Sequence, residues 1–328
     1  MRRRDFIKVI AGSAITWPLA ARAQPVMPVV GFVNGFSAAA SPRYVTAFRK
    51  GLSETGHVEG QNVAVEYHFL EGQYNGLQAL MADLVRRQVR SVIATPGSDV
   101  TARAAKAATA TIPIVFGVGE DPVRLGLVPN LARPGGNATG VNFFLVDLIA
   151  KRLRLLHDMV PKAVRIAVLL NPDNTSIAES TLREAQAAAP AIGLKIQILN
   201  AATIDEIDVA FASLAREGAD ALFVAPDGFF TSCAVQFATL AARGRIPATF
   251  SNIDYVAAGG LMSYGTDVPD TFRQVGVYTG SILKGAKPAD LPVLQSTKFV
   301  FAINLQTARA LNIEVPPGLL AIADEVIE

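Results

Sequence analysis

The chain of 328 residues contains the same series of four strand-like segments twice, in the same order. Each segment is a short apolar run, and helix-like stretches separate it from the next one. The last segment of each copy shares an Ile-Pro-x-x-Phe pattern, which begins at Ile112 and at Ile246. The eight segments are residues 29–33, 63–67, 91–94 and 112–116, and then 165–170, 195–199, 221–224 and 246–250. Because strands that alternate with helices form parallel sheets covered by helices on both faces, the repeat predicts an α/β protein with two Rossmann-like lobes.

The loops that follow these strands are where a ligand site is expected. In open parallel sheets, ligands bind outside the carboxyl ends of the strands. Two lobes that face each other across those ends would form a cleft, and the helix starts there offer backbone N–H groups that favour anions. Two tandem domains with separate sites are the alternative, but no linker-like stretch lies between the copies.

Residues 1–23 have the pattern of a secretory signal. Arg3 and Arg4 precede a short apolar stretch over residues 9–21, and small residues around Ala23 mark a cleavage site. The paired arginines resemble a twin-arginine signal, with the Sec route as the alternative. The apolar stretch is too short to span a membrane. We therefore expect residues 1–23 to be a signal peptide, and the mature protein to be exported and soluble in the periplasm.

The balance of charge argues against a nucleic-acid partner. The chain has 30 basic and 28 acidic residues, a net charge of +2. Residues 1–23 hold five of the basic residues and one of the acidic ones, so the remainder carries a net charge of −2. A slightly acidic protein lacks the basic patch that binds a phosphate backbone.

The sequence contains none of the motifs that mark enzymes built on such sheets. It has no Gly-x-Ser-x-Gly elbow, no Walker phosphate loop and no complete dinucleotide fingerprint. The three histidines lack metal-ligand spacing, and Cys233 is the single cysteine, so a cysteine-based metal cluster is excluded. These observations predict a binding protein without catalytic activity, cofactor or metal. A periplasmic enzyme with unrecognised chemistry is an alternative.

Several stretches of the chain are similar to the ABC-transporter substrate-binding proteins of the tryptophan/tyrosine type, the ABC_sub_bind family. These stretches are residues 56–62, 111–116, 131–141, 259–265, 282–292 and 323–327. The resemblance implies a type I periplasmic binding protein, a flytrap whose two lobes are joined by a three-segment hinge. Lobe one would hold residues 24–141 plus 254–287, and lobe two residues 142–253 plus 288–328. The resemblance also implies the membrane permease of an ABC importer as partner, and we expect the protein to be a monomer.

The candidate ligand-binding residues lie in loops after the predicted strands. In chain order they are Asn34, Phe36, Ser37, Thr95, Gly97, Ser98, Gly119, Asp121, Asn171, Asn174, Thr175, Asp227, Asn252 and Tyr264.

Several of these residues have two interpretations. Gly97 and Ser98 open a helix whose N–H groups would bind a carboxylate, unless Ser98 is simply a helix cap. Asp227 would pair with a ligand ammonium, or it forms an Asp-Gly turn. Asn174 and Thr175 would bond polar ligand atoms or cap the next helix.

The aromatic candidates and Asp121 also have alternatives. Phe36 and Tyr264 would form an apolar or aromatic wall, or they belong to the cores of the lobes. Asp121 precedes a proline, so a stiffened turn is equally consistent with its position.

The predicted function is that of the solute-binding component of an ABC importer, which captures a small molecule between the lobes by hinge closure. The ligand classes are an amino acid, aromatic ones included, and a small carboxylate. An extracytoplasmic sensor module that presents ligand to a receptor has the same fold and cleft, and it is the alternative function.

Overall fold

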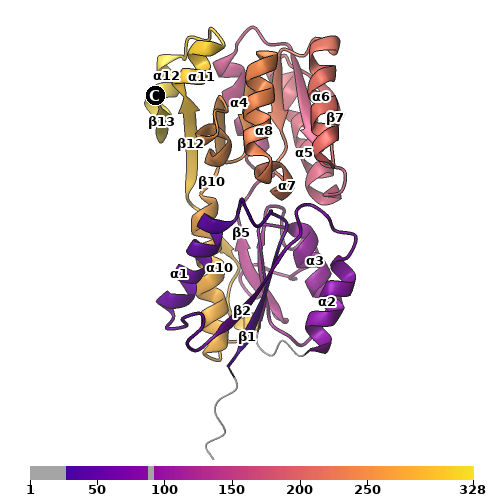
Figure 1. Cartoon of the computed structure of the whole chain (residues 1–328), viewed down its shortest axis with the longest axis vertical. Helices are drawn as coiled ribbons and strands as arrows, with labels where there is room; N and C mark the ends of the chain where they lie inside the picture. Colours follow the sequence, from indigo (N-terminus) through magenta and orange to yellow (C-terminus); the bar gives the residue numbers. More distant parts are fainter. Residues whose placement is uncertain (1–26, 88–91) are drawn as a thin grey trace, which may run out of the picture.

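The structure is a computed structural model that describes residues 27–87 and 92–328, so the predicted signal peptide lies outside the described residues. Two lobes lie one above the other along the longest axis (Figure 1). Among the helices of the described residues, none is long and apolar enough to cross a bilayer.

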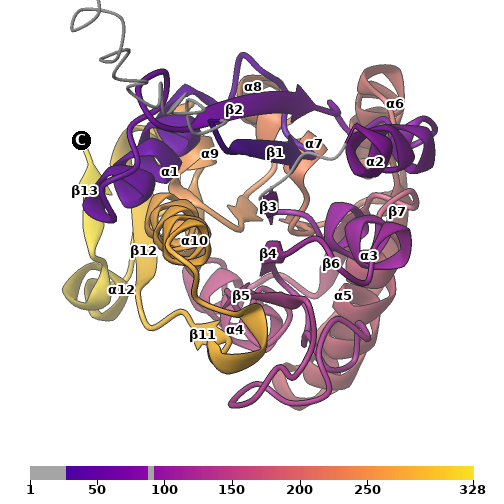
Figure 2. The ribbon, with the colours of Figure 1, turned by 90° about the horizontal axis from the view of Figure 1, so that it is seen from below.

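The first lobe is a parallel sheet with two helices on each face. Figure 2 looks along this lobe and shows α1 and α10 on one side of the sheet and α2 and α3 on the other. In the order β2-β1-β3-β4-β5-β11, the strands are Ala64–Phe69, Val29–Asn34, Val92–Pro96, Ile114–Val118, Ala138–Asn142 and Leu294–Gln295. The helices are α1 (Pro42–Glu54), α2 (Leu77–Arg86), α3 (Asp99–Ala108) and α10 (Val268–Leu283), with the short turn η2 (Pro288–Asp290) before β11.

The backbones of helices α1 and α10 are in direct contact where the helices cross, because each helix has a glycine there, Gly51 and Gly276. A Cβ atom on Gly51 would lie 1.9 Å from the Arg273 carbonyl oxygen, and one on Gly276 would lie 2.2 Å from that of Phe48. The apolar face of α1, with Tyr44 and Phe48, is buried against the sheet. This packing fixes α10 to the first lobe.

The second lobe repeats the arrangement and extends it. Its sheet has the order β7-β6-β8-β9-β10-β12-β13. In that order the strands are Lys195–Asn200, Arg165–Leu170, Ala221–Val224, Ala248–Phe250, Met262–Thr266, Phe299–Asn304 and Glu325–Ile327. Strands β10 and β12 are antiparallel, and the other described pairs are parallel.

Helices again cover both faces of this sheet. One face carries α4 (Ile149–Met159), α5 (Thr175–Ala188), η1 (Ala189–Ile192), α11 (Leu305–Ala310) and α12 (Pro317–Ile322). The other carries α6 (Ile204–Glu217), α7 (Gly228–Ser232), α8 (Ala234–Gly244) and α9 (Ile253–Ala257).

The predicted repeat is confirmed, since the first four strands of each lobe have one spatial order, β2-β1-β3-β4 and β7-β6-β8-β9. The fourth strands begin after the shared proline, at Ile114 and at Ala248. Proline has no N–H group to donate to a neighbouring strand, so it marks the strand boundary rather than an interior position.

The strand pairing corrects the expected division of the lobes at two places. Strand β10 pairs with β9, just as β5 pairs with β4, so α9 and β10 belong to the second lobe although residues 254–287 were expected in the first. Strand β11 pairs with β5 in the first lobe, although residues 288–328 were expected in the second. The chain therefore crosses between the lobes after β5, after β10 and after β11.

The three crossing segments are hydrogen-bonded to one another. The Thr266 hydroxyl donates to the Phe143 carbonyl oxygen, which joins the first and second segments. The backbone N–H of Asp267 donates to the Lys298 carbonyl oxygen at 3.1 Å, and that of Ser296 to the Asn142 carbonyl oxygen at 2.9 Å. All three segments thus lie together on one side of the molecule.

Candidate functional site

A cavity lies between the lobes, where the carboxyl ends of the strands of both sheets face each other. The space between its atoms amounts to about 490 Å³, a volume that includes open solvent. Its lining residues are Phe36, Gly97, Ser98, Asp99, Gly119, Phe143, Leu145, Asn174, Ile177, Pro226, Asp227, Gly228, Thr231, Ser251, Asn252 and Val268. Both lobes and two of the crossing segments contribute to this wall.

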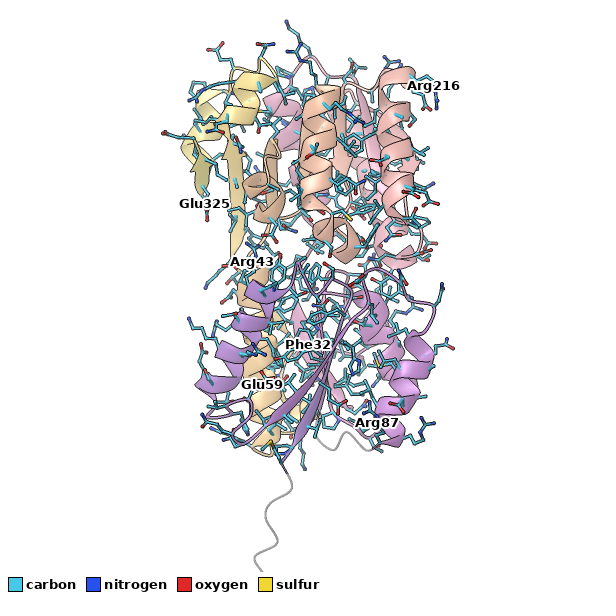
Figure 3. The ribbon with its side chains drawn as sticks, in the orientation of Figure 1. Phe32, Arg43, Glu59, Arg87, Arg216 and Glu325 are labelled. Carbon is cyan, nitrogen blue, oxygen red and sulfur yellow. The ribbon has the colours of Figure 1, made fainter. Side chains whose placement is uncertain are left out.

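Polar contacts hold the lobes together on both sides of the cavity. On one side, the Tyr44 hydroxyl donates to the Asp254 carboxylate, which also pairs with Arg43. Figure 3 shows Arg43 at the level where the two lobes meet, whereas Phe32 lies inside the first lobe. On the other side, Ser180 of α5 donates to the buried carboxylate of Glu120 in the first lobe.

A third contact joins the loop after β1 to the end of α7. The backbone N–H of Ser37 donates to the Ser232 hydroxyl oxygen at 2.9 Å. With contacts on both flanks and between the loops, the lobes are closed over the cavity.

The carboxylate of Asp227 in the second lobe accepts three hydrogen bonds. It is buried at the start of α7, where Oδ1 accepts hydrogen bonds from the Phe230 N–H at 3.0 Å and from Asn171 Nδ2 at 3.2 Å. Its Oδ2 accepts from Asn174 Nδ2 at 2.9 Å. Burial raises the pKa of Asp227, and these donors oppose the rise. The carboxylate therefore caps α7 and fixes two asparagines of the loop after β6.

In the first lobe, α3 begins at the edge of the cavity. Ser98 is its N-cap, and the Ser98 Oγ accepts from the Thr101 N–H at 3.3 Å. Gly97, directly before it, has a φ of +84°, and a Cβ atom there would lie 3.1 Å from the Phe36 ring. A side chain at this position would combine backbone strain with a close contact, so glycine keeps the ring against the helix start.

Asp99, the first residue of α3, carries a carboxyl group with one oxygen free. The side chain is 2% exposed, and Oδ1 accepts from the Gly119 N–H at 2.9 Å. Oδ2 is buried, and no described residue forms a hydrogen bond with it. Burial raises the pKa of Asp99 to about 7; the Gly119 N–H opposes this rise and the charge of Glu120 adds to it.

The remaining wall of the cavity combines apolar side chains with the neutral polar residues Thr231, Ser251 and Asn252. Phe36 is 5% exposed and stacks on Tyr44 with ring centroids 5.1 Å apart. The other apolar lining side chains are Phe143, Leu145, Ile177 and Val268. Among the polar residues, Asn252 Nδ2 donates to the Thr231 Oγ1 at 3.2 Å.

The charges of the cavity have one sign. Two acidic residues, Asp99 and Asp227, line it, and none of the lining residues in the described part of the chain is lysine, arginine or histidine. A bound molecule must therefore supply any positive charge itself. Groups of three or more residues with metal-binding side chains are absent from residues 27–87 and 92–328.

Half of the fourteen sequence-predicted residues line the cavity. They are Phe36, Gly97, Ser98, Gly119, Asn174, Asp227 and Asn252. Some of their alternative roles are also present in the structure, because Ser98 caps α3 and Phe36 belongs to the apolar core of the first lobe. Asp227 caps α7 and does not form the expected Asp-Gly turn.

The other seven predicted residues do not line the cavity. Asn34 and Thr95 are buried at the ends of β1 and β3, and Asn171 stands behind Asp227 as its donor. Ser37 and Thr175 line two other pockets at the boundary between the lobes.

Asp121 and Tyr264 have local structural roles instead. The Asp121 Oδ1 accepts from the Val123 N–H at 2.8 Å and forms a turn on the surface. Tyr264 packs against Phe299 and Phe301 within the second lobe.

Sequence reasoning missed the lining residues of the crossing segments and of the helix starts. Phe143, Leu145 and Val268 follow β5 and β10, and they line the cavity because the chain changes lobes there. Asp99 and Ile177 lie in the first turns of α3 and α5. The available signal was position, since the first turn after a strand faces the same edge of the sheet as the loop before it.

Two sheets of mostly parallel strands that close over a cavity define the fold of type I periplasmic binding proteins, and solved structures of this class superpose on most of the chain. The predicted fold is thus confirmed. Residues 29–327 match the family described as ABC transporter substrate binding protein, and the chain belongs to this family. Its members bind solutes and are not enzymes.

Three relatives place the chain more closely. A protein described as a tyrosine-binding protein from Clostridioides difficile strain R20291 is 28% identical over 271 residues, which cover 81% of this chain and 76% of that protein. The ABC domain from Streptococcus pneumoniae in complex with L-Trp has a TM-score of 0.81 at 25% identity, over 91% of this chain and 99% of that one. A ligand-free, open substrate-binding protein with adhesive properties from Clostridium difficile has a TM-score of 0.63 at 25% identity, over 92% and 99% of the two chains.

Proposed function

We propose that this protein captures an aromatic amino acid between its lobes and delivers it to the membrane permease of an ABC importer. The observation that carries the proposal is the cavity, which combines two acidic groups and a helix start with neutral polar and apolar side chains. The relatives described as a tyrosine-binding protein and as an L-Trp complex support the aromatic class.

The groups that line the cavity suit a zwitterion better than a simple carboxylate. The first N–H groups of an α-helix have no acceptor within the helix, so the start of α3 can bind a ligand carboxylate. When they are ionised, the buried acids Asp99 and Asp227 need a positive group to balance their charge. A carboxylate without an ammonium would add negative charge beside them, and we therefore favour an amino acid.

The comparison with the two solved relatives supports capture by closure. At equal identity and nearly equal coverage, the present arrangement is more similar to the L-Trp complex than to the ligand-free, open protein. We propose that the lobes open and close about the three crossing segments. A ligand that contacts both lobes then stabilises the closed form, because its affinity for that form is higher.

The remaining parts of the proposal concern location and partner. Residues 1–23 would direct the chain to the periplasm, where the mature protein acts as a monomer. The permease would recognise the closed form, and its ATPase would supply the energy for transport.

The proposal is tested by calorimetry on the purified mature protein with L-Tyr, L-Trp and L-Phe, and with benzoate and glucose for comparison. We expect a dissociation constant near micromolar for at least one aromatic amino acid, about −8 kcal/mol, and no binding of benzoate or glucose. Binding of benzoate or glucose with no response to any aromatic amino acid would refute the proposed ligand class.

A further inference from the structure

We propose that Asp99 is the residue that binds the ammonium group of the ligand, while Asp227 shapes the cavity without contacting that group. This inference rests on the proposed function and specifies its chemistry. It also reverses the expectation from the sequence, in which Asp227 was the partner of the ammonium.

The hydrogen bonds of Asp227 leave little room for a further donor. Two asparagine amides and the Phe230 N–H already donate to its two oxygens at 2.9–3.2 Å. A carboxylate has about four acceptor positions, so one at most remains for a ligand donor. An ammonium group that needed more than this position would displace Asn171 or Asn174 and leave that amide buried without a partner.

Asp99, by contrast, has one carboxylate oxygen without a hydrogen-bond partner. Its Oδ2 is buried at the cavity wall and has no partner among the described residues, whereas Oδ1 is held by the Gly119 N–H. A buried polar atom without a partner costs on the order of 1–3 kcal/mol, and more if it is charged. An ammonium group that arrives with the ligand would remove this cost and neutralise the carboxylate at once.

The position of Asp99 explains how the start of α3 would bind both the ammonium and the carboxylate of an amino acid. Its Oδ1 accepts from the Gly119 N–H, and the Ser98 Oγ accepts from the Thr101 N–H, so the N–H groups of Asp99 and Val100 are those of this turn that remain for a ligand. The ammonium and carboxylate of an amino acid are attached to one carbon atom, so their partners must also be neighbours. Asp99 and the α3 N–H groups meet this requirement within two residues.

The test compares amino acids with analogues that lack only the amino group. Dissociation constants are measured for L-Tyr and L-Trp, and for 3-(4-hydroxyphenyl)propionate and indole-3-propionate, on the wild type and on Asp99→Asn and Asp227→Asn. Removing one partner of a buried charge pair weakens binding on the order of 100-fold. We expect a loss of this size for the amino acids with Asp99→Asn, with little change for the analogues. Asp227→Asn should affect both kinds of ligand to a similar degree.

The outcomes separate the inference from the proposed function. If the wild type binds amino acids and Asp99→Asn keeps the full preference for them over the analogues, the inference is refuted and the proposed function stands. Loss of that preference only in Asp227→Asn would return the ammonium to Asp227. A wild type that binds neither kind of ligand contradicts both. Asp121→Asn, which changes a surface carboxylate of the same lobe, serves as the matched control and should behave as the wild type.

Discussion

The buried carboxyl group of Asp99 lowers the free energy of unfolding when it is ionised and has no cation beside it. Asp99 has its pKa raised to about 7, above the value near 3.9 that an aspartate has in an unfolded chain. Between these two values, the folded protein retains a proton that the unfolded chain has lost. The free energy of unfolding therefore falls as the pH rises from about 4 to 7. The charged groups near Asp99 are Glu120 and Arg103, and the neutral Tyr74 hydroxyl is also close to it. The carboxylate of Glu120 increases the effect, and the guanidinium of Arg103 reduces it.

Asp99→Asn should accordingly stabilise the protein in the absence of ligand. The amide keeps an oxygen for the Gly119 N–H and carries no charge at any pH. We expect the gain in the free energy of unfolding to be about 1–4 kcal/mol at pH 8 and to shrink toward zero near pH 4, since one pKa unit corresponds to about 1.4 kcal/mol. Urea unfolding of both proteins at several pH values measures it. An equal difference at every pH would show that the carboxyl of Asp99 does not titrate as described.

For single residues, the sequence predicted which loops form the site, but it did not predict the role of every side chain in them. Phe36, Ser98 and Asp227 follow predicted strands, and the parallel sheet brings their loops together at one edge. The role of Asp99 depends on a contact with Gly119, which lies 20 residues away, directly after the neighbouring strand β4. Such a contact has no local signature, so the chain around Asp99 predicted only a helix start.

The elements that the sequence predicted well are those with strong local patterns. The strands β1, β6 and β8 are runs of apolar, mostly branched residues, and their positions in the sheets follow from the repeat. Strand β10 carries a glycine, and β11 has two residues, so pairing with β9 and β5 rather than propensity makes them strands. These short strands determine where the chain crosses between lobes, and for this reason the predicted crossing points differ from the observed ones.

The contact between α1 and α10 should be sensitive to a single methyl group. Gly276→Ala would place a Cβ atom 2.2 Å from the Phe48 carbonyl oxygen and force the helices apart. We expect a loss of about 1–3 kcal/mol in the free energy of unfolding, as for other overpacked positions, measured by thermal or urea unfolding.

The matched control for this change is Gly244→Ala in α8, where no atom lies within 4 Å of the added Cβ. Alanine is favoured over glycine in a helix, so this variant should be neutral or slightly more stable. Similar losses in the two variants would mean that helix packing is not the cause.

For the molecule as a whole, polar contacts at the boundary join the two lobes in the present arrangement. The pairs formed by Asp254 with Tyr44 and Arg43, and by Ser180 with Glu120, join opposite lobes. If the lobes separate as proposed, water can replace the partners of these polar side chains. Such contacts would therefore stabilise the closed form without exposing apolar surface in the open form.

Asp254→Ala should weaken ligand binding without altering the cavity. The contacts of Asp254 across the lobes exist only in the closed form, so their loss disfavours closure by about 1 kcal/mol, which is roughly fivefold in affinity. Calorimetry with L-Tyr or L-Trp measures the affinity, and small-angle scattering follows closure on addition of ligand. Glu59→Gln, which removes an ion pair with Arg49 inside the first lobe, is the control and should keep wild-type affinity. Equal effects of the two substitutions would exclude a role for Asp254 in closure.

The three crossing segments are hydrogen-bonded to one another through Phe143, Lys298 and Asn142, on one flank of the molecule. If the lobes open about these segments, as proposed, they separate at the opposite flank, which the edge strands β2 and β7 form. A solute would then enter and leave past these two strands. Its route would thus follow from where the three segments are hydrogen-bonded together.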